Sequence, residues 1–250
     1  MIARHQGVFV IAQARLGSTR LPGKVMMPLA GKPIVTWVMD RASRAAVEGT
    51  ILAIPDRPEE EVLVQLGRRQ GYRVHRGEGE DVQARFLSAA RAAGAHTIVR
   101  LTCDNPLVDH VLINRLVAGH LESNADYSSF GMAGPFPIGL SVEAFSAEAL
   151  VRARQVSDQE FHREHVTPAF YLNPDRFKLT AVEPPSLLRR ADLRLTVDTR
   201  EDYDALSRLV SLFEGRDPLT ISAEEYVEAL LQHEEIRAIN AGVHQKQLGE

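Results

Sequence analysis

A loop rich in glycine and cationic side chains lies near the start of the chain, at residues 13–24. Two glycines, two hydroxyl residues and three cations stand within these twelve positions: Gly17, Gly23, Ser18, Thr19, Arg15, Arg20 and Lys24. Glycines let the backbone approach a ligand closely, and Arg and Lys neutralise phosphate charge, so this composition suits a triphosphate-binding loop. The spacing excludes a Walker A loop, because five residues separate the two glycines and Val25 follows the lysine. A solvated basic surface loop is the alternative, and the buried strand expected just before the loop disfavours it.

Two further segments place an aspartate near the end of an expected strand. Asp104 follows residues 97–101, and Asp198 follows residues 194–197. Each has an ordinary alternative, since Asp-Asn-Pro is a turn signal and Asp198 or Thr199 could cap a following helix. Two carboxylates at parallel strand ends beside a phosphate loop are, however, what a metal-assisted phosphoryl reaction requires. The pair therefore favours a shared catalytic role over two unrelated structural ones.

Short apolar runs alternate with helical patterns through the first half of the chain. Strands are expected at residues 8–12, 50–54, 72–75 and 97–101, and helices at 34–45, 59–71 and 82–93. Uninterrupted apolar strands alternating with helices are typical of a parallel sheet covered on both faces. The predicted fold is therefore α/β with three layers, in which helices cover both faces of a mostly parallel central sheet. Ligands of such sheets bind beyond the carboxyl ends of the strands, where the loops after residues 12, 101 and 197 are expected to meet.

The pattern changes from about residue 127, where glycines and prolines punctuate the chain. These residues mark turns, and we expect a small antiparallel insertion over about 127–190, with short strands near 140–145 and 178–182. A strand at 194–197 is then expected to return to the main sheet. Two helices, near 201–213 and 223–232, are expected to form a C-terminal helical region over about 201–240. Residues 1–250 are interpreted as a single domain.

Composition disfavours several classes of protein. The 29 basic and 33 acidic side chains give a formal net charge of −4, which disfavours general binding to nucleic acid. The single cysteine, Cys103, cannot form an intrachain disulfide. No apolar run near the start of the chain is long enough for a signal peptide or a membrane span. We therefore expect a cytoplasmic protein with no nucleic-acid or membrane partner.

The loop and both aspartate segments resemble the cytidylyltransferases, which make CMP-activated sialic acids and CMP-activated ketodeoxyoctonate. Residues 14–24 and 29–34 match the opening of that superfamily, most closely in its spore-coat polysaccharide synthesis protein F branch. The resemblance implies one nucleotidyltransferase domain of the nucleotide-diphospho-sugar transferase type, with Mg²⁺ held by Asp104 and Asp198. The nucleotide site that it implies consists of Ala12, Ala14, Arg15, Gly17, Ser18, Arg20, Lys24, Thr102 and Asp104. The catalytic residues are expected to be Arg15, Lys24, Asp104 and Asp198.

Two later segments also resemble the spore-coat branch. Residues 137–146 contain Gly139 and Glu143, and residues 163–168 contain His165. We expect these three residues to contact the acceptor, with Gly139 allowing the backbone to pass close to the ligand. A buried structural role for Glu143 is an equally open alternative. His165 could contact the acceptor or a phosphate, and a position without a ligand contact is equally open for it. Similar enzymes use this region to reach a partner subunit, so a homodimer is expected by resemblance.

The resulting expectation is a CTP-dependent cytidylyltransferase that transfers CMP to a small anionic acceptor and releases pyrophosphate, in surface polysaccharide or related biosynthesis. The acceptor stays open between a sugar acid and a phosphate or phosphonate compound. Three alternatives remain: a nucleotidyltransferase that uses another NTP on a sugar phosphate, a glycosyltransferase, and a non-catalytic nucleotide-binding module. The Asp-x-Asp motif usual in glycosyltransferases is missing at residues 104–106, and the retained aspartate pair argues against a non-catalytic module. Cys103 stands where many relatives have glycine, and we interpret it as structural.

Overall fold

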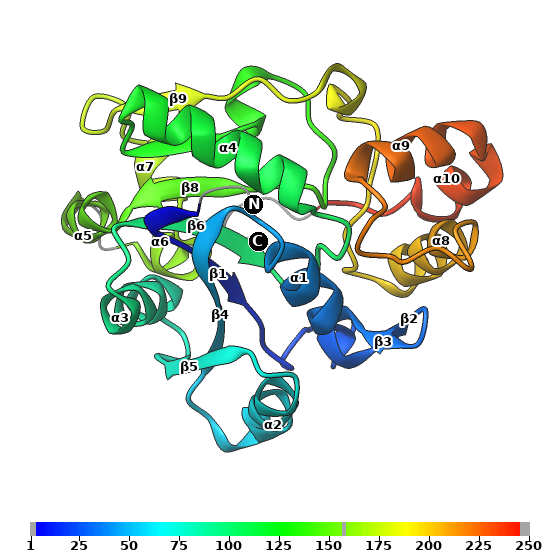
Figure 1. Cartoon of the computed structure of the whole chain (residues 1–250), viewed down its shortest axis with the longest axis horizontal. Helices are drawn as coiled ribbons and strands as arrows, with labels where there is room; N and C mark the ends of the chain where they lie inside the picture. The colour runs from blue at the N-terminus through cyan, green and yellow to red at the C-terminus, as the bar shows by residue number, and fades with distance from the viewer. Residues whose placement is uncertain (1–3, 157–158, 246–250) are drawn as a thin grey trace.

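The computed structural model describes residues 4–156 and 159–245. Seven strands form the main sheet, in the order β5-β4-β1-β6-β8-β7-β9 (Figure 1). Their bounds are β1 (His5–Gln13), β4 (Val47–Pro55), β5 (Arg73–Gly77), β6 (Thr97–Thr102), β7 (Tyr127–Ser129), β8 (Glu143–Ser146) and β9 (Leu179–Ala181). A separate two-stranded antiparallel sheet is formed by β2 (Pro28–Leu29) and β3 (Lys32–Pro33).

Strand β1 lies between β4 and β6 and is parallel to both, and β5 is parallel to β4. The expected mostly parallel sheet is therefore confirmed. The antiparallel part is β8, which runs opposite to its two neighbours β6 and β7. Strand β8 pairs with β6, β7 pairs with β8, and β9 pairs with β7. The strands expected in the 127–190 region therefore extend the main sheet.

Helices cover both faces of this sheet. Successive side chains of a strand point to opposite faces, and apolar side chains on both faces of β1 are buried. Val8, Val10 and Ala12 of β1 pack into one hydrophobic cluster, and Phe9 and Ile11 pack into another. The first cluster includes side chains of α1 (Ile34–Ala42), α2 (Glu61–Arg69) and α4 (His110–Ser123). The second includes side chains of α3 (Val82–Ala93), α5 (Ala147–Val156) and α7 (Pro168–Tyr171). The three-layer prediction is confirmed, although α4, α5 and α7 were not anticipated.

Three helices near the end of the chain gather beside the sheet, at the right of Figure 1. They are α8 (Arg200–Ser211), α9 (Ala223–Gln232) and α10 (Glu234–Asn240). A capping box begins α8, in which the Thr199 side chain accepts from the Asp202 amide while the Asp202 side chain accepts from the Thr199 amide. Of the two capping candidates weighed from the sequence, Thr199 is therefore the N-cap, and the Asp198 side chain is free for other contacts.

The strand expected at residues 194–197 is wrong. Within the part of the chain that the structure describes, this segment makes a single isolated bridge, between Arg194 and Ile138. Its backbone is still fixed, since the Leu195 amide donates to the Ile138 carbonyl at 2.7 Å and the Val197 amide donates to the Asp104 carbonyl at 2.8 Å. The apolar pattern arose because the segment is buried, not because it pairs along a strand.

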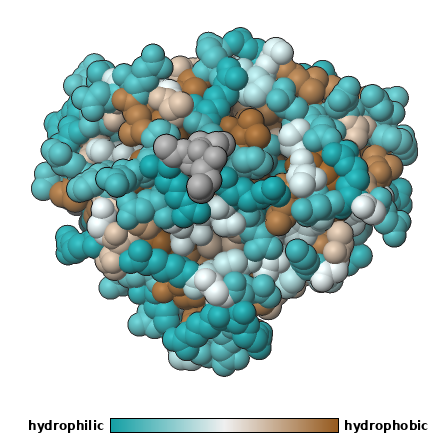
Figure 2. Space-filling model, viewed as in Figure 1, coloured by the Kyte–Doolittle hydropathy of each residue, from teal (hydrophilic) through white to brown (hydrophobic). Residues whose placement is uncertain are grey.

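The molecular surface shown in Figure 2 is mostly hydrophilic, with hydrophobic side chains in small separate patches. Large apolar side chains such as Trp37 and Phe86 are instead buried in the core. Among the described helices, none has the length and apolar character needed to cross a membrane.

Candidate active site

A cavity of about 1150 Å³ opens at the carboxyl ends of β1 and β6. Its walls come from the loop after β1, the ends of β6, the 138–141 segment and α6 (Glu160–His165). Ten residues predicted from the sequence line it: Ala14, Arg15, Ser18, Arg20, Lys24, Thr102, Asp104, Gly139, His165 and Asp198. Fold topology thus brings together side chains such as those of Lys24 and Asp198, which are 174 residues apart in the chain.

The centre of the site is an ammonium group held between two carboxylates. Lys24 Nζ lies 2.8 Å from Asp104 Oδ2 and 2.8 Å from Asp198 Oδ1. The side chains are 11%, 26% and 13% exposed for Lys24, Asp104 and Asp198, so the contacts are only partly screened by water. The other Asp198 oxygen, Oδ2, accepts from Arg194 Nη2 at 2.9 Å and pairs with Arg20 at 3.1 Å.

Burial and charge compete in setting the protonation of this cluster. Burial disfavours the Lys24 ammonium, but Asp104 and Asp198 outweigh it and raise the pKa of Lys24 above its usual value. Burial likewise disfavours the Asp198 carboxylate, yet Lys24, Arg20 and Arg194 together lower the pKa of Asp198. Lys24 and Asp198 are therefore both ionised at neutral pH.

The glycine-rich loop is held in shape by its own backbone and by one buried acid. The Leu16 carbonyl accepts from the amides of Ser18 at 2.8 Å and Gly23 at 3.0 Å. The Leu16 amide in turn donates to both carboxylate oxygens of Glu60, at 3.0 and 3.1 Å. Gly23 has a φ of +69°, a left-handed conformation that glycine adopts without strain, and the 3₁₀ turn carrying Lys24 follows it. Glu60 was missed, because an acid in a helical pattern carries no sign of this contact.

Three predicted site residues do not line the cavity, namely Ala12, Gly17 and Glu143. Ala12 is wholly buried in the core on the α1 side of the sheet. A Cβ at Gly17 would meet no atom of the described residues within 4 Å, so no packing contact with them requires glycine there. The Glu143 carboxylate is turned toward Arg100 and accepts from the Tyr127 hydroxyl at 2.6 Å. The structure thus favours the structural alternative for Glu143.

Arg100 is a cavity residue that the sequence did not single out. It stands opposite Glu143 in the β6–β8 pairing and forms an ion pair with it, while its Nε donates to Gln13 at 3.3 Å. Burial and the Glu143 charge raise the pKa of Tyr127 well above its usual value, so the Tyr127 hydroxyl keeps its proton and donates it. Glu143 and Gln13 together fix the guanidinium of Arg100 at the cavity wall.

Arg85 is a second missed cation in the cavity wall. Its side chain is almost fully buried and hydrogen bonds to the carbonyls of Glu78 and Gly79, but its Nε has no partner in the described part of the chain. Burial lowers the pKa of Arg85 to about 10. A buried donor without a partner is costly, so the Arg85 Nε is an uncompensated polar atom in a residue that lines the cavity. In the sequence it looks like any arginine on a helix surface.

His165 and Arg15 occupy the side of the cavity formed by α6. Burial lowers the pKa of His165, and Arg100 and Arg15 add to this effect, so His165 is neutral at pH 7. Arg15 lies 3.4 Å from Glu164, with both side chains about half exposed. This contact is weak and leaves Arg15 able to turn toward a ligand.

The two aspartates are suitable ligands for Mg²⁺. Within residues 4–156 and 159–245, no group of three or more His, Cys, Asp or Glu side chains could enclose a metal ion. Mg²⁺ does not need one, because it is usually bound by one or two carboxylates together with substrate phosphates and water. One oxygen of each aspartate reaches the same Lys24 ammonium, so a single cation can contact both carboxylates.

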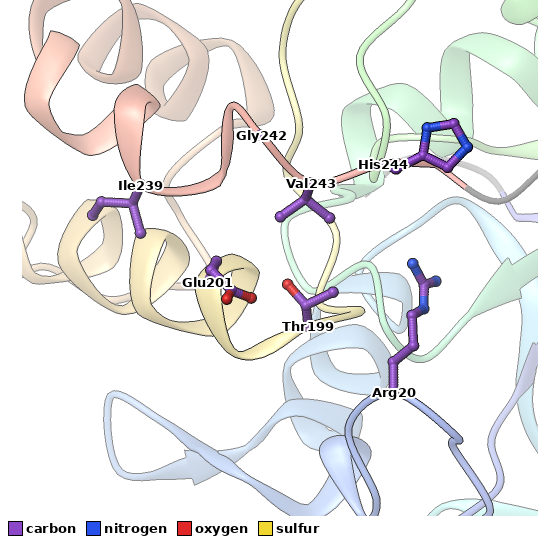
Figure 3. Close-up of a pocket in the computed structure, with 7 residues that line it drawn as sticks. All are labelled: Arg20, Thr199, Glu201, Ile239, Gly242, Val243 and His244. Carbon is purple, nitrogen blue, oxygen red and sulfur yellow. The ribbon is translucent and has the colours of Figure 1, made fainter.

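A smaller cavity of about 520 Å³ adjoins the first, beside the start of α8 (Figure 3). Its lining residues are Arg20, Thr199, Glu201, Ile239, Gly242, Val243 and His244. In Figure 3, the Arg20 side chain extends from its loop toward the segment that carries His244. Arg20 lines both cavities, so the C-terminal segment borders the site.

The sequence pattern of the cytidylyltransferase family matches residues 9–247. The chain belongs to the cytidylyltransferase family. It is 33% identical over 231 residues to the spore coat polysaccharide biosynthesis protein SpsF of Bacillus subtilis, covering 89% of this chain and 93% of that protein. It is 30% identical over 152 residues to a 3-deoxy-manno-octulosonate cytidylyltransferase of Vibrio vulnificus, covering 60% of this chain and 58% of that protein. A cytidylyltransferase structure from Leptospira borgpetersenii superposes with a TM-score of 0.83 at 26% identity, covering 97% of this chain and all of that one.

Membership in this family confirms the predicted resemblance and makes the protein a nucleotidyltransferase. The structure also agrees with the structural interpretation of Cys103. In this cytidylyltransferase Cys103 is 1% exposed, and burial raises the pKa of its thiol well above the usual value, so no reactive thiolate forms.

Gly139 approaches protein backbone, and this contact explains why glycine is needed. Its φ is +98°, and a Cβ there would lie 2.2 Å from the carbonyl carbon of Leu195 and from the amide nitrogen of Thr196. We expect Gly139→Ala to lower the free energy of unfolding by more than about 2 kcal/mol, through backbone strain and displacement of the 195–196 segment. Urea denaturation would measure this loss. Gly131→Ala is the matched control, since its Cβ would meet none of the described atoms within 4 Å. An equal loss there would contradict the explanation.

Proposed function

We propose that this enzyme transfers CMP from CTP to a small anionic acceptor and releases pyrophosphate. The observation that carries the proposal is the Lys24–Asp104–Asp198 cluster, which lies in the cavity beside the glycine-rich loop. Membership in the cytidylyltransferase family supports CTP as the nucleotide. An acceptor oxygen forms the new bond to the α-phosphorus, the bond from that phosphorus to the bridging oxygen breaks, and pyrophosphate leaves with the electron pair.

The chain's own residues contribute positioning and charge. Arg15, Arg20 and Lys24 hold the β- and γ-phosphates, and the leaving pyrophosphate retains these partners. Lys24 and Arg20 pair with aspartates in the structure, so they exchange a carboxylate for a phosphate when nucleotide binds. Asp104 and Asp198 would hold Mg²⁺, which when bound polarises the α-phosphate as a Lewis acid.

The acceptor is proposed to be a sugar acid or a phosphate or phosphonate compound. Its anionic group would lie near Arg100 and His165, on the part of the cavity that the 138–141 segment and α6 enclose. Glu143 would then act through Arg100 and not on the acceptor itself. The names of the two relatives, one in spore coat polysaccharide biosynthesis and one acting on 3-deoxy-manno-octulosonate, support a role in surface polysaccharide or related biosynthesis.

Replacing Arg100 by glutamine tests the acceptor side of the site. We expect the KM for the acceptor to rise about 10- to 100-fold, because a charge-assisted hydrogen bond contributes about 1.5–3 kcal/mol, while the KM for CTP stays within about twofold. Steady-state kinetics with each substrate varied in turn would measure both. Arg115→Gln is the control, since Arg115 is exposed on α4. A rise in the KM for CTP alone would place Arg100 in the nucleotide site.

The reaction itself is tested by pyrophosphate release in the presence of Mg²⁺. Each of the four ribonucleoside triphosphates is combined with sugar acids, sugar phosphates and phosphonates in turn. We expect release with CTP and one acceptor class. Release with GTP or UTP but not CTP would establish a different nucleotidyltransferase, and CTP binding without release from any acceptor would favour a non-catalytic module.

We also propose a cytoplasmic homodimer, as the family resemblance implies. Sedimentation equilibrium of the full chain would measure the mass in solution against the 27.7 kDa of one chain. A monomeric mass at concentrations where the enzyme is fully active would contradict the dimer.

A further inference from the structure

The C-terminal helix α10 reaches the active site through buried hydrogen bonds. Asn240, at the end of α10, is 5% exposed. Its side-chain amide donates to Asp202 Oδ1 at 3.0 Å and to the Arg194 carbonyl at 3.2 Å. A buried amide with both of its N–H groups engaged is a specific contact, because an unpaired one would be costly.

Asp202 connects this amide to the catalytic aspartate. Its side chain is wholly buried, and its carboxylate accepts from the Arg194 guanidinium through two hydrogen bonds, at 2.7 and 2.9 Å. The same carboxylate accepts from the backbone amides of Asp198 at 3.0 Å and Thr199 at 3.1 Å. Asp202 therefore fixes the backbone from which the Asp198 side chain extends.

Arg194 fixes the Asp198 side chain itself. Besides its two bonds to Asp202, it donates to Asp198 Oδ2 at 2.9 Å and to the Gln245 side-chain oxygen. With Oδ2 held in this way, Asp198 presents Oδ1 toward Lys24 and Asp104. The guanidinium is planar and forked, so its bonds to Asp202 determine which direction remains for Asp198.

We propose that Asn240, Asp202 and Arg194 are positioning residues that orient Asp198 for binding of the cation and the nucleotide. The inference rests on the role assigned to Asp198 under the proposed function. The neutral amide of Asn240 is suited to this place, because it donates to Asp202 without adding a charge. An acid at position 240 would face Asp202 directly and break the contact. Thus α10 is part of the active-site framework, although among its described residues only Ile239 lines a cavity there, and that is the smaller one.

The experiment compares four variants of the full chain: Asn240→Ala, Asn240→Asp, Ile236→Ala and Asp198→Asn. The affinity for CTP is measured by calorimetry with Mn²⁺ in place of Mg²⁺, and the bound Mn²⁺ is followed by electron paramagnetic resonance. Thermal denaturation shows that each variant is folded at the temperature used. Ile236→Ala is the matched control, since Ile236 is buried on the same helix and its apolar side chain packs into the hydrophobic core.

We expect both Asn240 variants to bind Mn²⁺–CTP about tenfold more weakly, as is typical when a residue that orients a metal ligand is removed. Ile236→Ala should lower the melting temperature and leave the affinity within about twofold. Asn240→Asp separates hydrogen bonding from space filling, because it preserves the volume of the side chain. Near-normal affinity in folded Asn240→Asp would overturn the inference.

The reference variant distinguishes this inference from the proposed function. If Asp198→Asn weakens Mn²⁺–CTP binding while both Asn240 variants leave it unchanged, the positioning role is wrong and the role of Asp198 stands. If Asp198→Asn also leaves Mn²⁺–CTP binding unchanged, the role proposed for Asp198 is wrong, and so is the inference that rests on it. If Ile236→Ala weakens Mn²⁺–CTP binding as much as the Asn240 variants do, the loss of affinity arises from poorer packing of α10. That result contradicts the proposal.

Discussion

Asp198→Asn is expected to reduce turnover by about 10²- to 10³-fold, the effect usual for removing one preorganised electrostatic group from an active site. The substitution keeps the size of the side chain and removes its charge. Asp198 contacts Lys24, Arg20 and Arg194, so its amide analogue would leave three cations without one of their counter-charges. Initial rates of pyrophosphate release at saturating CTP and acceptor would measure the loss.

Asp204→Asn provides the control for this substitution on the following helix. Asp204 forms an exposed pair with Arg200 at 2.9 Å, and exposed pairs contribute little to stability. Its turnover should match that of the unmodified enzyme. Near-normal turnover in Asp198→Asn would instead remove Asp198 from the catalytic machinery.

Lys24→Ala is expected to weaken CTP binding by about 10- to 100-fold, since hydrogen bonds to charged groups contribute about 1.5–3 kcal/mol each. Lys24 is also one of the charges that lower the pKa of Asp198. Without Lys24 the pKa of Asp198 rises, so its carboxylate becomes protonated at a higher pH. As the pH is lowered, activity is therefore lost at a higher pH than in the unmodified enzyme. Calorimetric titration with CTP and a pH–rate profile would measure the two effects.

Lys32→Ala is the matched control, because Lys32 is about half exposed on the β2–β3 hairpin and lies 3.8 Å from Asp40. Both its CTP affinity and its acid limb should be unchanged. If Lys24→Ala bound CTP normally while its acid limb moved, Lys24 would serve only to tune Asp198, and its contact with the triphosphate would be wrong.

Local patterns were sufficient to predict most of the first half of the fold. The helix at 82–93 agrees with α3, because apolar positions recur on one face between a capping aspartate and a terminal glycine. The strand predicted at residues 194–197 is wrong because its apolar pattern reflects burial alone. Burial produces the same apolar alternation whether or not a neighbouring strand supplies a ladder, so local sequence cannot distinguish the two.

The sequence by itself predicted the glycine-rich loop and the pair of aspartates, because the residue types that suggest each of them stand together in short segments. Tertiary structure alone decided which side chains meet there. Glu60 behind the loop, Arg85 and Arg100 in the cavity wall and Asn240 behind Asp198 carry no local signal, since their contacts join segments far apart in the chain. The tertiary structure also directs the Glu143 side chain toward Arg100, because the pairing of β6 with β8 places these two residues opposite each other. An ion pair or a buried amide depends on what folding brings within 3 Å, and residue spacing along the chain does not encode that distance.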